Sequence, residues 1–247
     1  MQKCVSFIIV LLAINLQLYS QSVFGSAKPE LNPADSLFQA KQYTQALKFY
    51  DQLFDNGLYS PSMLLRMGYI QEGLGHLGES LFFLNSYFGT TFDNQALNKM
   101  EEIAKKNQLE GYKFDEEAKF FYWIQKHYFT ISYFLCAGIL LTFIFMIYLR
   151  LVIKERPIAS VVIMMGLIVL LFLHINFNKA KTNGVVIASD TYLMSSPSAG
   201  GDVVEIIGEG HKLEILGKED VWFRVIWKDK TVYVKQFLIR PIPKYVS

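Results

Sequence analysis

Two long apolar runs dominate the pattern of hydrophobic and polar positions along the chain. Residues 128–149 and 158–178 contain no Asp, Glu, Lys or Arg. Each run reaches the roughly 20 residues with which an α-helix crosses a hydrocarbon core. The pattern therefore predicts two transmembrane helices joined by a short loop, 150–157. The composition agrees, because 52% of the residues are hydrophobic and only 19% are charged, against about 25% charged in ordinary soluble domains.

A third apolar run lies at the N-terminus, between Lys3 and a group of small residues that ends at Ala27. A basic start, an apolar centre and a small-residue exit are typical of a secretory signal. Residues 1–27 are therefore interpreted as a signal peptide, and an uncleaved anchor helix is the alternative. In both cases the residues that follow are exported.

The loop between the two long runs is basic. It carries Arg150, Lys154 and Arg156 against a single acidic residue. Basic residues of short loops stay in the cytoplasm, so both flanking regions are expected on the opposite side of the membrane. Lys179 and Lys181 favour the opposite orientation, but they are fewer.

The segment before the first long run, residues 111–127, is rich in aromatic residues. Phe120, Phe121, Tyr122 and Trp123 follow one another directly. Aromatic rings gather where a membrane meets water, so an interfacial helix is expected here. A helix buried in a soluble core is the alternative.

Residues 28–110 show apolar positions at helical spacing, separated by turn signals. The pattern predicts a helix starting near Pro33, helices over 43–53, 61–73 and 78–88, and a capping helix over 92–106.

Two of these predicted helices repeat with an offset of 34 residues. Tyr43-x-x-Ala46-Leu47-x-x-Tyr50-x-x-Leu53 aligns with Leu77-x-x-Ser80-Leu81-x-x-Leu84-x-x-Tyr87. The period, together with Leu64-x-x-Met67-Gly68 in the helix between, resembles the tetratricopeptide repeat. That resemblance implies paired helices that stack into a concave surface. An unrelated bundle of helical hairpins is the alternative.

Gly73-Leu74-Gly75-His76-Leu77-Gly78 matches the spacing G-x-G-x-x-G of dinucleotide-binding turns. That fingerprint must follow a strand and open a helix, whereas a helical pattern precedes these glycines. We interpret them as the turn between two paired helices. His76 is then a turn residue and not a ligand.

From residue 184 onward the pattern changes to short β-type runs. Strands are predicted over 184–188, 203–207, 213–216, 221–227 and 231–234, with a tight turn at 228–230. Five short strands in about 60 residues are typical of a small barrel.

Motifs within residues 184–242 resemble the bacterial SH3 (SH3b) family. The matching stretches are Ser196-Pro197-Ser198, Ile207-Gly208-Glu209-Gly210 and Trp222-Phe223-Arg224-Val225. The chain departs from the family where Val232-Tyr233-Val234 replaces the usual Gly-Trp-Val, which counts against a conventional aromatic binding groove. Trp222 and Tyr233 are candidates for the surface or the core of the barrel.

No motif for catalysis, cofactor binding or metal binding is found in the sequence. The net charge of +2 argues against a nucleic-acid-binding protein. Cys4 and Cys136 both lie in apolar runs, so the polar parts have neither a disulfide nor a cysteine nucleophile. We therefore expect no enzyme activity, no cofactor and no metal site.

The fold class expected is a multidomain membrane protein with α-helical tetratricopeptide-like hairpins (28–110), two transmembrane helices and a small all-β SH3-like barrel (184–242). This order of parts resembles the E component (BatE) of the bacterial aerotolerance (Bat) operon. The resemblance implies an inner-membrane protein with both soluble domains in the periplasm. It also implies a non-enzymatic role in tolerance of oxygen or envelope stress, in an assembly with other Bat membrane proteins, some of which carry von Willebrand A domains.

Recognition of a partner protein is the function that the sequence favours. Tyr43, Tyr50, Leu64 and Tyr69 are the residues expected to line or support the helical groove. The alternative is an envelope protein that binds peptidoglycan through its SH3b-like barrel. A transporter would need polar groups within the membrane, and few are available there besides His174.

Overall fold

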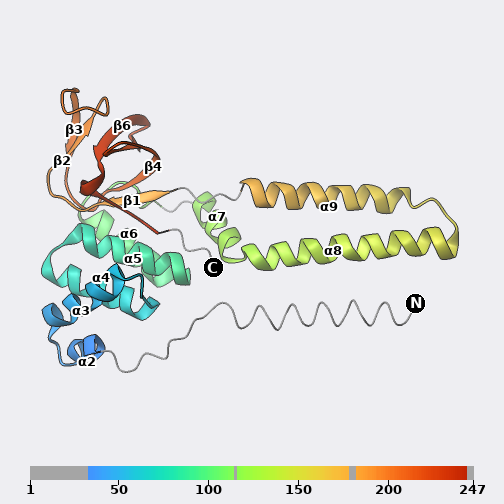
Figure 1. Ribbon diagram of the computed structural model, residues 1–247, viewed down its shortest axis with the longest axis horizontal. Helices are drawn as coiled ribbons and strands as arrows, with labels where there is room; N and C mark the ends of the chain where they lie inside the picture. The colour runs from blue at the N-terminus through green and yellow to red at the C-terminus, as the bar shows by residue number, and fades with distance from the viewer. Residues whose placement is uncertain (1–32, 114–115, 178–181, 244–247) are drawn as a thin grey trace.

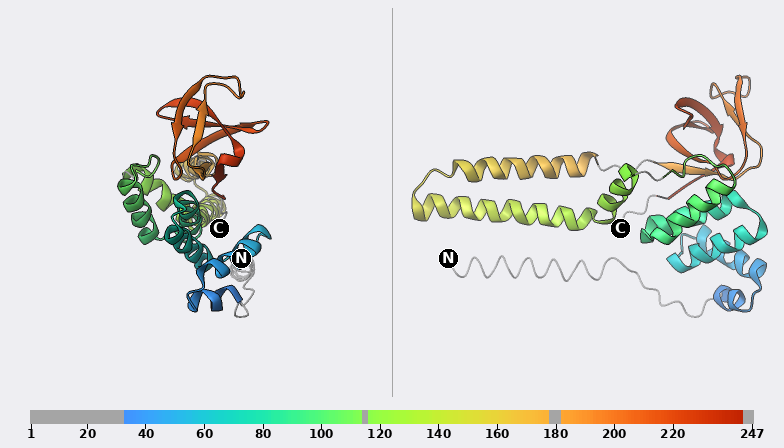
Figure 2. Two further views of the ribbon diagram at one scale, coloured as in Figure 1. Left: turned by 90° about the vertical axis from the view of Figure 1, so that its left-hand side faces the viewer. Right: turned by 180° about the vertical axis from the view of Figure 1, so that it is seen from behind.

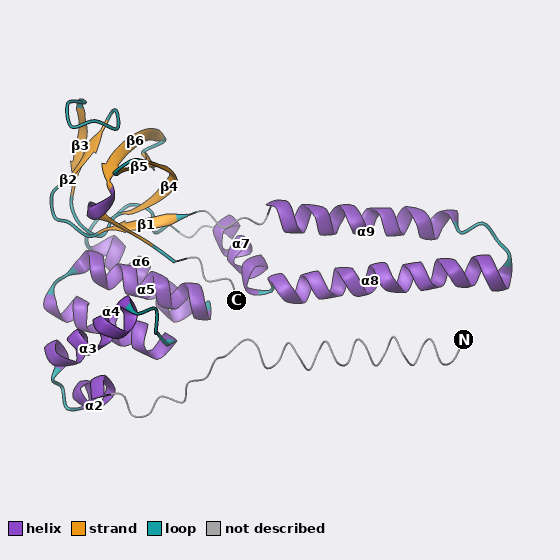
Figure 3. Ribbon diagram, viewed as in Figure 1, coloured by secondary structure: helices purple, strands orange, loops and turns teal. Residues whose placement is uncertain are grey.

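The computed structural model describes residues 33–113, 116–177 and 182–243 of the chain. Helices come first and an antiparallel sheet comes last (Figures 1 and 3). This order confirms the predicted succession of a helical region, two long apolar helices and a small β-structure. The predicted signal peptide, residues 1–27, lies outside the described residues.

Five helices form the first part of the structure, called the helical unit below. They are α2 (Pro33–Gln39), α3 (Tyr43–Asp55), α4 (Pro61–Leu74), α5 (Leu77–Thr91) and α6 (Asn94–Lys106). Turn chemistry sets the bounds of α4. The Ser60 side chain accepts a hydrogen bond from the Met63 N–H (3.2 Å) at its start, and Gly75 ends it in the left-handed conformation, with a φ of 81°.

The helical unit has a continuous apolar core. Helices α4 and α5 pack side by side, and Gly68 permits their close approach, since a Cβ there would lie 3.3 Å from the Leu84 side chain. The largest fully buried side chains come from four of the helices: Tyr50, Leu64, Met67, Leu81, Phe82, Phe83 and Met100.

Helix α7 (Glu116–Lys126) leads into two long apolar helices, α8 (Tyr128–Tyr148) and α9 (Ile158–Phe177). Helix α8 continues as a π-helical turn, Leu149–Ile153, so the connection to α9 is shorter than the predicted loop. Both helices are long and apolar enough to span a membrane. They run side by side away from the rest of the molecule (Figures 1 and 2). Most of their large apolar side chains are exposed.

The C-terminal part is a seven-stranded antiparallel sheet with the order β3-β2-β6-β5-β4-β1-β7. Its strands are β1 (Asn183–Val186), β2 (Thr191–Met194), β3 (Val203–Ile207), β4 (Lys212–Glu219), β5 (Trp222–Trp227), β6 (Lys230–Lys235) and β7 (Ile239–Pro241). Strands β2 and β7 were not expected from the sequence. Pro241, which has no N–H to donate, lies in β7 at the edge of the sheet, where such a residue is tolerated.

Strand β1 connects the two cores of the molecule. Successive side chains of a strand point to opposite faces. Val185 packs into the core of the helical unit, whereas Val186 packs into the core of the sheet. The helical unit and the sheet therefore share an extensive contact, called the junction below. Both lie at the same end of the α8–α9 pair (Figure 1).

Candidate functional site

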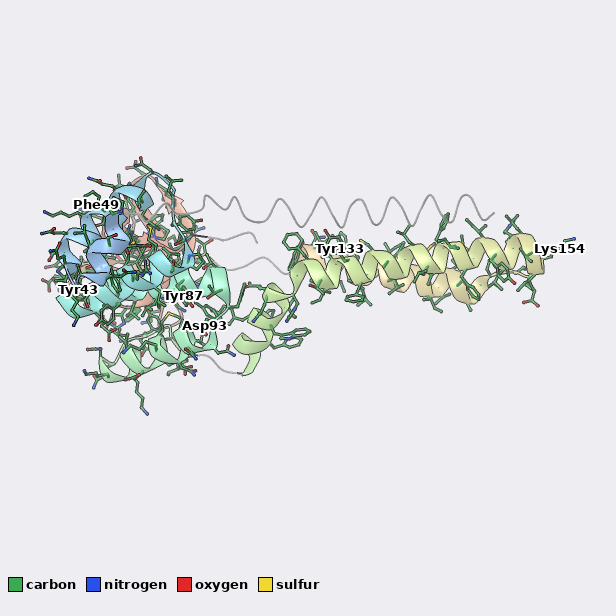
Figure 4. All side chains as sticks on the ribbon, turned by 90° about the horizontal axis from the view of Figure 1, so that it is seen from below. Tyr43, Phe49, Tyr87, Asp93, Tyr133 and Lys154 are labelled. Carbon is green, nitrogen blue, oxygen red and sulfur yellow. The ribbon has the colours of Figure 1, made fainter. Side chains whose placement is uncertain are left out.

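An aromatic cluster lies at the end of the helical unit that is far from α8. It joins Phe38 of α2, Tyr43 of α3 and Tyr69 of α4, whose ring centroids are 5.3 to 6.1 Å apart in edge-to-face arrangements. Figure 4 shows Tyr43 in this position. Tyr69 is 57% exposed, and Leu65, one helical turn earlier on α4, is exposed beside it. We call these four residues the aromatic patch.

A polar network of Asp35, Tyr50 and Arg66 lies next to the aromatic patch. The Tyr50 hydroxyl donates a hydrogen bond to Asp35 Oδ1 (2.6 Å), and Arg66 Nη1 donates to the Tyr50 oxygen (3.3 Å). Arg66 also forms an ion pair with Asp35, and its guanidinium lies 5.3 Å from the centroid of the Phe38 ring. The network therefore ties together α2, α3 and α4, the three helices that carry the rings of the patch.

The network also changes the acidity of its members. Burial, followed by the hydrogen bond to Asp35, raises the pKa of Tyr50 to about 12. The hydrogen bond to Asp35 raises the pKa of Arg66 above its ordinary value. Both groups therefore keep their protons to a higher pH than an unperturbed Tyr or Arg.

The four residues expected to line or support a groove have different environments. Tyr43 and Tyr69 belong to the aromatic patch. Tyr50 is buried beneath the patch, and Leu64 is fully buried in the core between helices. The structure thus brings two of the four together at the surface and places the other two inside. Phe38 completes the patch and was not singled out in the sequence.

The two candidates in the sheet lie apart from the patch. Trp222 is only 7% exposed and is paired across the strands with Lys235, whose ammonium lies 5.7 Å from the indole centroid. Tyr233 is half-buried on β6 and pairs with Arg224. The structure thus presents neither ring as an open platform.

The junction is the second site where residues distant in sequence meet. Arg240 of β7 extends over α5, where it forms an ion pair with Glu79. Its guanidinium carbon lies 4.2 Å from the centroid of Phe82, 5.1 Å from that of Phe83 and 5.3 Å from that of Phe54. A single side chain of the sheet therefore contacts both α3 and α5.

Backbone N–H groups also donate hydrogen bonds across the junction. The Gly78 N–H donates to Glu209 Oε2 (2.9 Å), and the Lys212 N–H donates to the Glu110 carbonyl oxygen (3.1 Å). The Glu110 N–H donates in turn to His211 Nδ1 (3.0 Å). Because Nδ1 accepts this bond, the ring carries its proton on Nε2, and burial lowers the His211 pKa.

Lys212 is the most strongly perturbed charged residue of the junction. Its Nζ lies 3.5 Å from Asn85 Oδ1 and 4.9 Å from the centroid of the Tyr112 ring. Burial lowers its pKa to about 8. Tyr112 is itself buried, and its hydroxyl donates to the Gly210 carbonyl oxygen (2.8 Å).

Two glycines allow the backbone on the helical side to approach the backbone of the sheet closely. A Cβ on Gly78 would lie 2.5 Å from the Val186 carbonyl oxygen, and a Cβ on Gly111 would lie 2.1 Å from that of Lys212. Gly78 was predicted both in the turn and as the start of the helix over 78–88; the structure places it as the second residue of α5, against the sheet. His76 does lie in the turn, where its Nδ1 is 2.9 Å from Gln71 Oε1.

Among the described side chains, no group of three or more His, Cys, Asp or Glu residues is arranged to hold a metal ion. No family model, curated protein or solved structure matches this chain.

Proposed function

We propose that the protein is a non-enzymatic membrane scaffold that binds partner proteins through its helical unit. The observation that carries this proposal is the aromatic patch, in which the exposed Tyr69 ring contacts the half-buried rings of Phe38 and Tyr43. A partly buried polar network ties together the helices that carry these rings. Exposed Tyr residues with fixed rings are enriched among the residues that dominate protein–protein binding, because they bury a large area at small entropic cost.

The proposal places α8 and α9 across a membrane. Their length, their apolar composition and their exposed apolar side chains support this placement. Because the two helices form a hairpin, the helical unit and the sheet lie on the same side. The basic connection, with Arg150, Lys154 and Arg156, favours the cytoplasm for the tip of the hairpin. Both folded parts then lie in the periplasm of a bacterial inner membrane.

The proposed assembly is the one implied by the resemblance to BatE, with tetratricopeptide-like helices and an SH3b-like sheet. Its partners are other Bat-type membrane proteins, including those with von Willebrand A domains. Paired helices α4 and α5, the Gly68 contact between them and the small antiparallel sheet support this assignment. In this reading the junction presents the helical unit and the sheet to the partner as one body.

The test is affinity purification of the full chain from gently solubilised membranes, followed by mass spectrometry. Von Willebrand A-domain membrane proteins are expected with the native chain. Their recovery is expected to fall about 30-fold with Tyr69→Ala, as for the loss of an aromatic anchor. Phe49→Ala is the matched control, because Phe49 is 43% exposed on α3, about 120° around the helix from Tyr43.

Equal recovery with Tyr69→Ala and the native chain would contradict the role of the patch. Recovery of peptidoglycan fragments or wall enzymes in place of these partners would instead favour the alternative, in which the sheet binds the cell wall. Because Trp222 is buried, it offers that alternative no ring platform.

A further inference from the structure

A cavity of about 500 Å³ lies between the helical unit and α7. That volume is typical of small-molecule and lipid sites. Three aromatic side chains, Phe88, Phe92 and Tyr122, form its apolar wall. Asn94 and Asn98, in the first part of α6, also line it.

The apolar wall is built from fixed rings. Phe88 of α5 lies edge-on to Phe92, at 5.8 Å between centroids, and to Tyr122 of α7, at 5.0 Å. Phe92 ends α5 in the left-handed conformation, with a φ of 51°, which is unfavourable for a bulky side chain. Its N–H donates to the Phe88 carbonyl oxygen (2.8 Å), so the turn keeps the Phe92 ring in the wall.

Polar contacts hold the turn behind this wall. The Tyr87 hydroxyl donates to Asp93 Oδ2 (3.0 Å), and the Gln95 N–H donates to Asp93 Oδ1 (2.9 Å). Tyr87 and Asp93 lie together on the side of the helical unit nearer α8 (Figure 4). Both carboxylate oxygens of Asp93 are therefore already hydrogen-bonded within the turn.

The cavity lies where the chain enters the proposed membrane. Its α7 wall ends with Trp123, Lys126 and His127, and α8 begins at the next residue, Tyr128. Phe120, Phe121 and Trp123 are exposed on the same helix. Exposed aromatic rings just before a membrane helix are typical of the headgroup level of a bilayer.

The charges of the cavity have one sign. Lys126 is a cation, His127 lies beside it, and none of the nine described residues that line the cavity is acidic. An apolar wall next to a cation and amide groups, at the headgroup level, matches a molecule with an anionic phosphate and a hydrocarbon chain.

We propose that this cavity binds an anionic phospholipid of the surrounding leaflet. The phosphate lies at Lys126 and His127, the amide groups of Asn94 and Asn98 contact the headgroup, and the upper part of one acyl chain packs against Phe88 and its neighbours. The inference rests on the proposed membrane placement of α8 and α9, and it adds a lipid as a specific ligand. The bound lipid would fix α7 against the helical unit.

The protein contains its own reporter for this site. Of its three Trp residues, Trp123 is 54% exposed at the cavity, whereas Trp222 and Trp227 are buried in the sheet, at 7% and 5% exposed. Bromine atoms near the top of an acyl chain quench a neighbouring indole on contact. The full chain is placed in phosphatidylcholine nanodiscs that contain an equal small fraction of either brominated phosphatidylglycerol or brominated phosphatidylcholine. Trp123→Phe identifies the part of the signal that comes from Trp123.

The expected result is stronger quenching of Trp123 by the anionic lipid than by the zwitterionic lipid at equal fraction. Lys126→Asn should reduce this preference about fivefold, the effect of one basic residue near an anionic membrane surface. Lys154→Asn is the matched control, because it removes one positive charge at the far end of α8 (Figure 4). The backbone at Lys154 is left-handed, with a φ of 63°, a conformation that Asn tolerates. Asn98→Phe fills the cavity and should abolish the preference without changing any charge.

Three results would overturn the inference. Equal quenching by the two lipids in the native chain would show that no anionic lipid is selected. An unchanged preference in both Lys126→Asn and Asn98→Phe would place the selection elsewhere. If neither lipid quenches Trp123 and alkaline carbonate extracts the chain from membranes, the membrane placement fails, and the proposed function fails with it. Quenching by both lipids without preference overturns the lipid site alone.

Discussion

Truncation of Arg240 is the most informative perturbation of the junction. In the native chain this side chain forms an ion pair with Glu79 and stacks over three rings, the nearest being Phe82, with its centroid 4.2 Å from the guanidinium carbon. Arg240→Ala removes both interactions and leaves the helices and strands themselves unchanged. The junction should then open more often while each part stays folded.

The magnitude follows from the two interactions that are lost. The side chains of Arg240 and Glu79 are about three quarters buried, and an ion pair of this kind contributes about 1 kcal/mol. Stacking of the guanidinium on the aromatic rings contributes roughly another 1 kcal/mol. Together they shift the opening equilibrium by about 2 kcal/mol, which is roughly a 30-fold larger open population.

Hydrogen exchange with mass spectrometry on the detergent-solubilised full chain measures this opening. The Gly78 and Lys212 amides report it, because each donates its hydrogen bond across the junction. Their exchange should accelerate about 30-fold in Arg240→Ala. Arg224→Ala is the control: it removes an ion pair with Glu219, 3.3 Å long, that lies within the sheet. Unchanged exchange at the two amides in Arg240→Ala would refute the reasoning.

Further predictions concern glycines, one buried hydroxyl and two titrating groups. Gly111→Ala should open the junction, since Gly111 has a φ of 92° and the new Cβ would lie 2.1 Å from the Lys212 carbonyl oxygen. Gly73→Ala should instead stabilise the helical unit by about 0.5–1 kcal/mol in thermal unfolding, because Gly73 lies inside a helix and its new Cβ would meet no atom within 4 Å. Tyr50→Phe removes a hydrogen bond to a carboxylate and should cost about 1.5–3 kcal/mol in denaturant unfolding. The pKa of His211 is lowered in the folded chain, so the junction should lose stability as the pH falls below 6.5, the ordinary value. His211→Gln can still accept the hydrogen bond from the Glu110 N–H and should remove that loss, as measured by hydrogen exchange. Folding lowers the pKa of Lys212 from 10.5 to about 8, so between these pH values the unfolded chain binds more protons than the folded chain. The free energy of unfolding should therefore rise with pH across this range, and Lys212→Met should remove that rise.

The sequence predicted the helices well because their signals are local. Apolar spacing gave the faces, and Ser60, Pro61 and Gly75 set the bounds of α4. Strands β2 and β7 were missed because their four and three residues are too few to show an alternating pattern. Strand β2 pairs mainly with the next strand, β3, whereas β7 pairs with the distant β1. Residues 150–153 were expected in a loop, but hydrogen bonding continues from α8 through a π-helical turn.

The candidate site was predicted in part. Periodicity marks apolar positions but does not separate a ring at the surface from one in the core. Tyr50 and Leu64 therefore looked like Tyr43 and Tyr69 in the sequence, although the first two are buried. Phe38 was missed as a member of the patch because only the fold brings α2 against α4.

The junction left almost no signal in the sequence. Its hydrogen bonds join residues as far apart as Gly78 and Glu209, and several of them use backbone atoms, which every residue has. Gly78 and Gly111 allow the contact, but a glycine beside a helix end is ordinarily explained by turn chemistry. A contact of this kind becomes visible only when both parts are seen together.

The central claim is that the helical unit and the sheet both lie on the outer side of a membrane, with the tip of the α8–α9 hairpin on the inner side. Labelling of single cysteines in spheroplasts with a membrane-impermeant maleimide tests it most directly. In a chain with Cys4 and Cys136 replaced by Ser, the variants Lys48→Cys in the helical unit and Asp229→Cys in the sheet should both be labelled. Glu155→Cys, between α8 and α9, should be labelled only after lysis. Labelling of Glu155→Cys in intact spheroplasts, or of only one of the other two positions, would contradict the account.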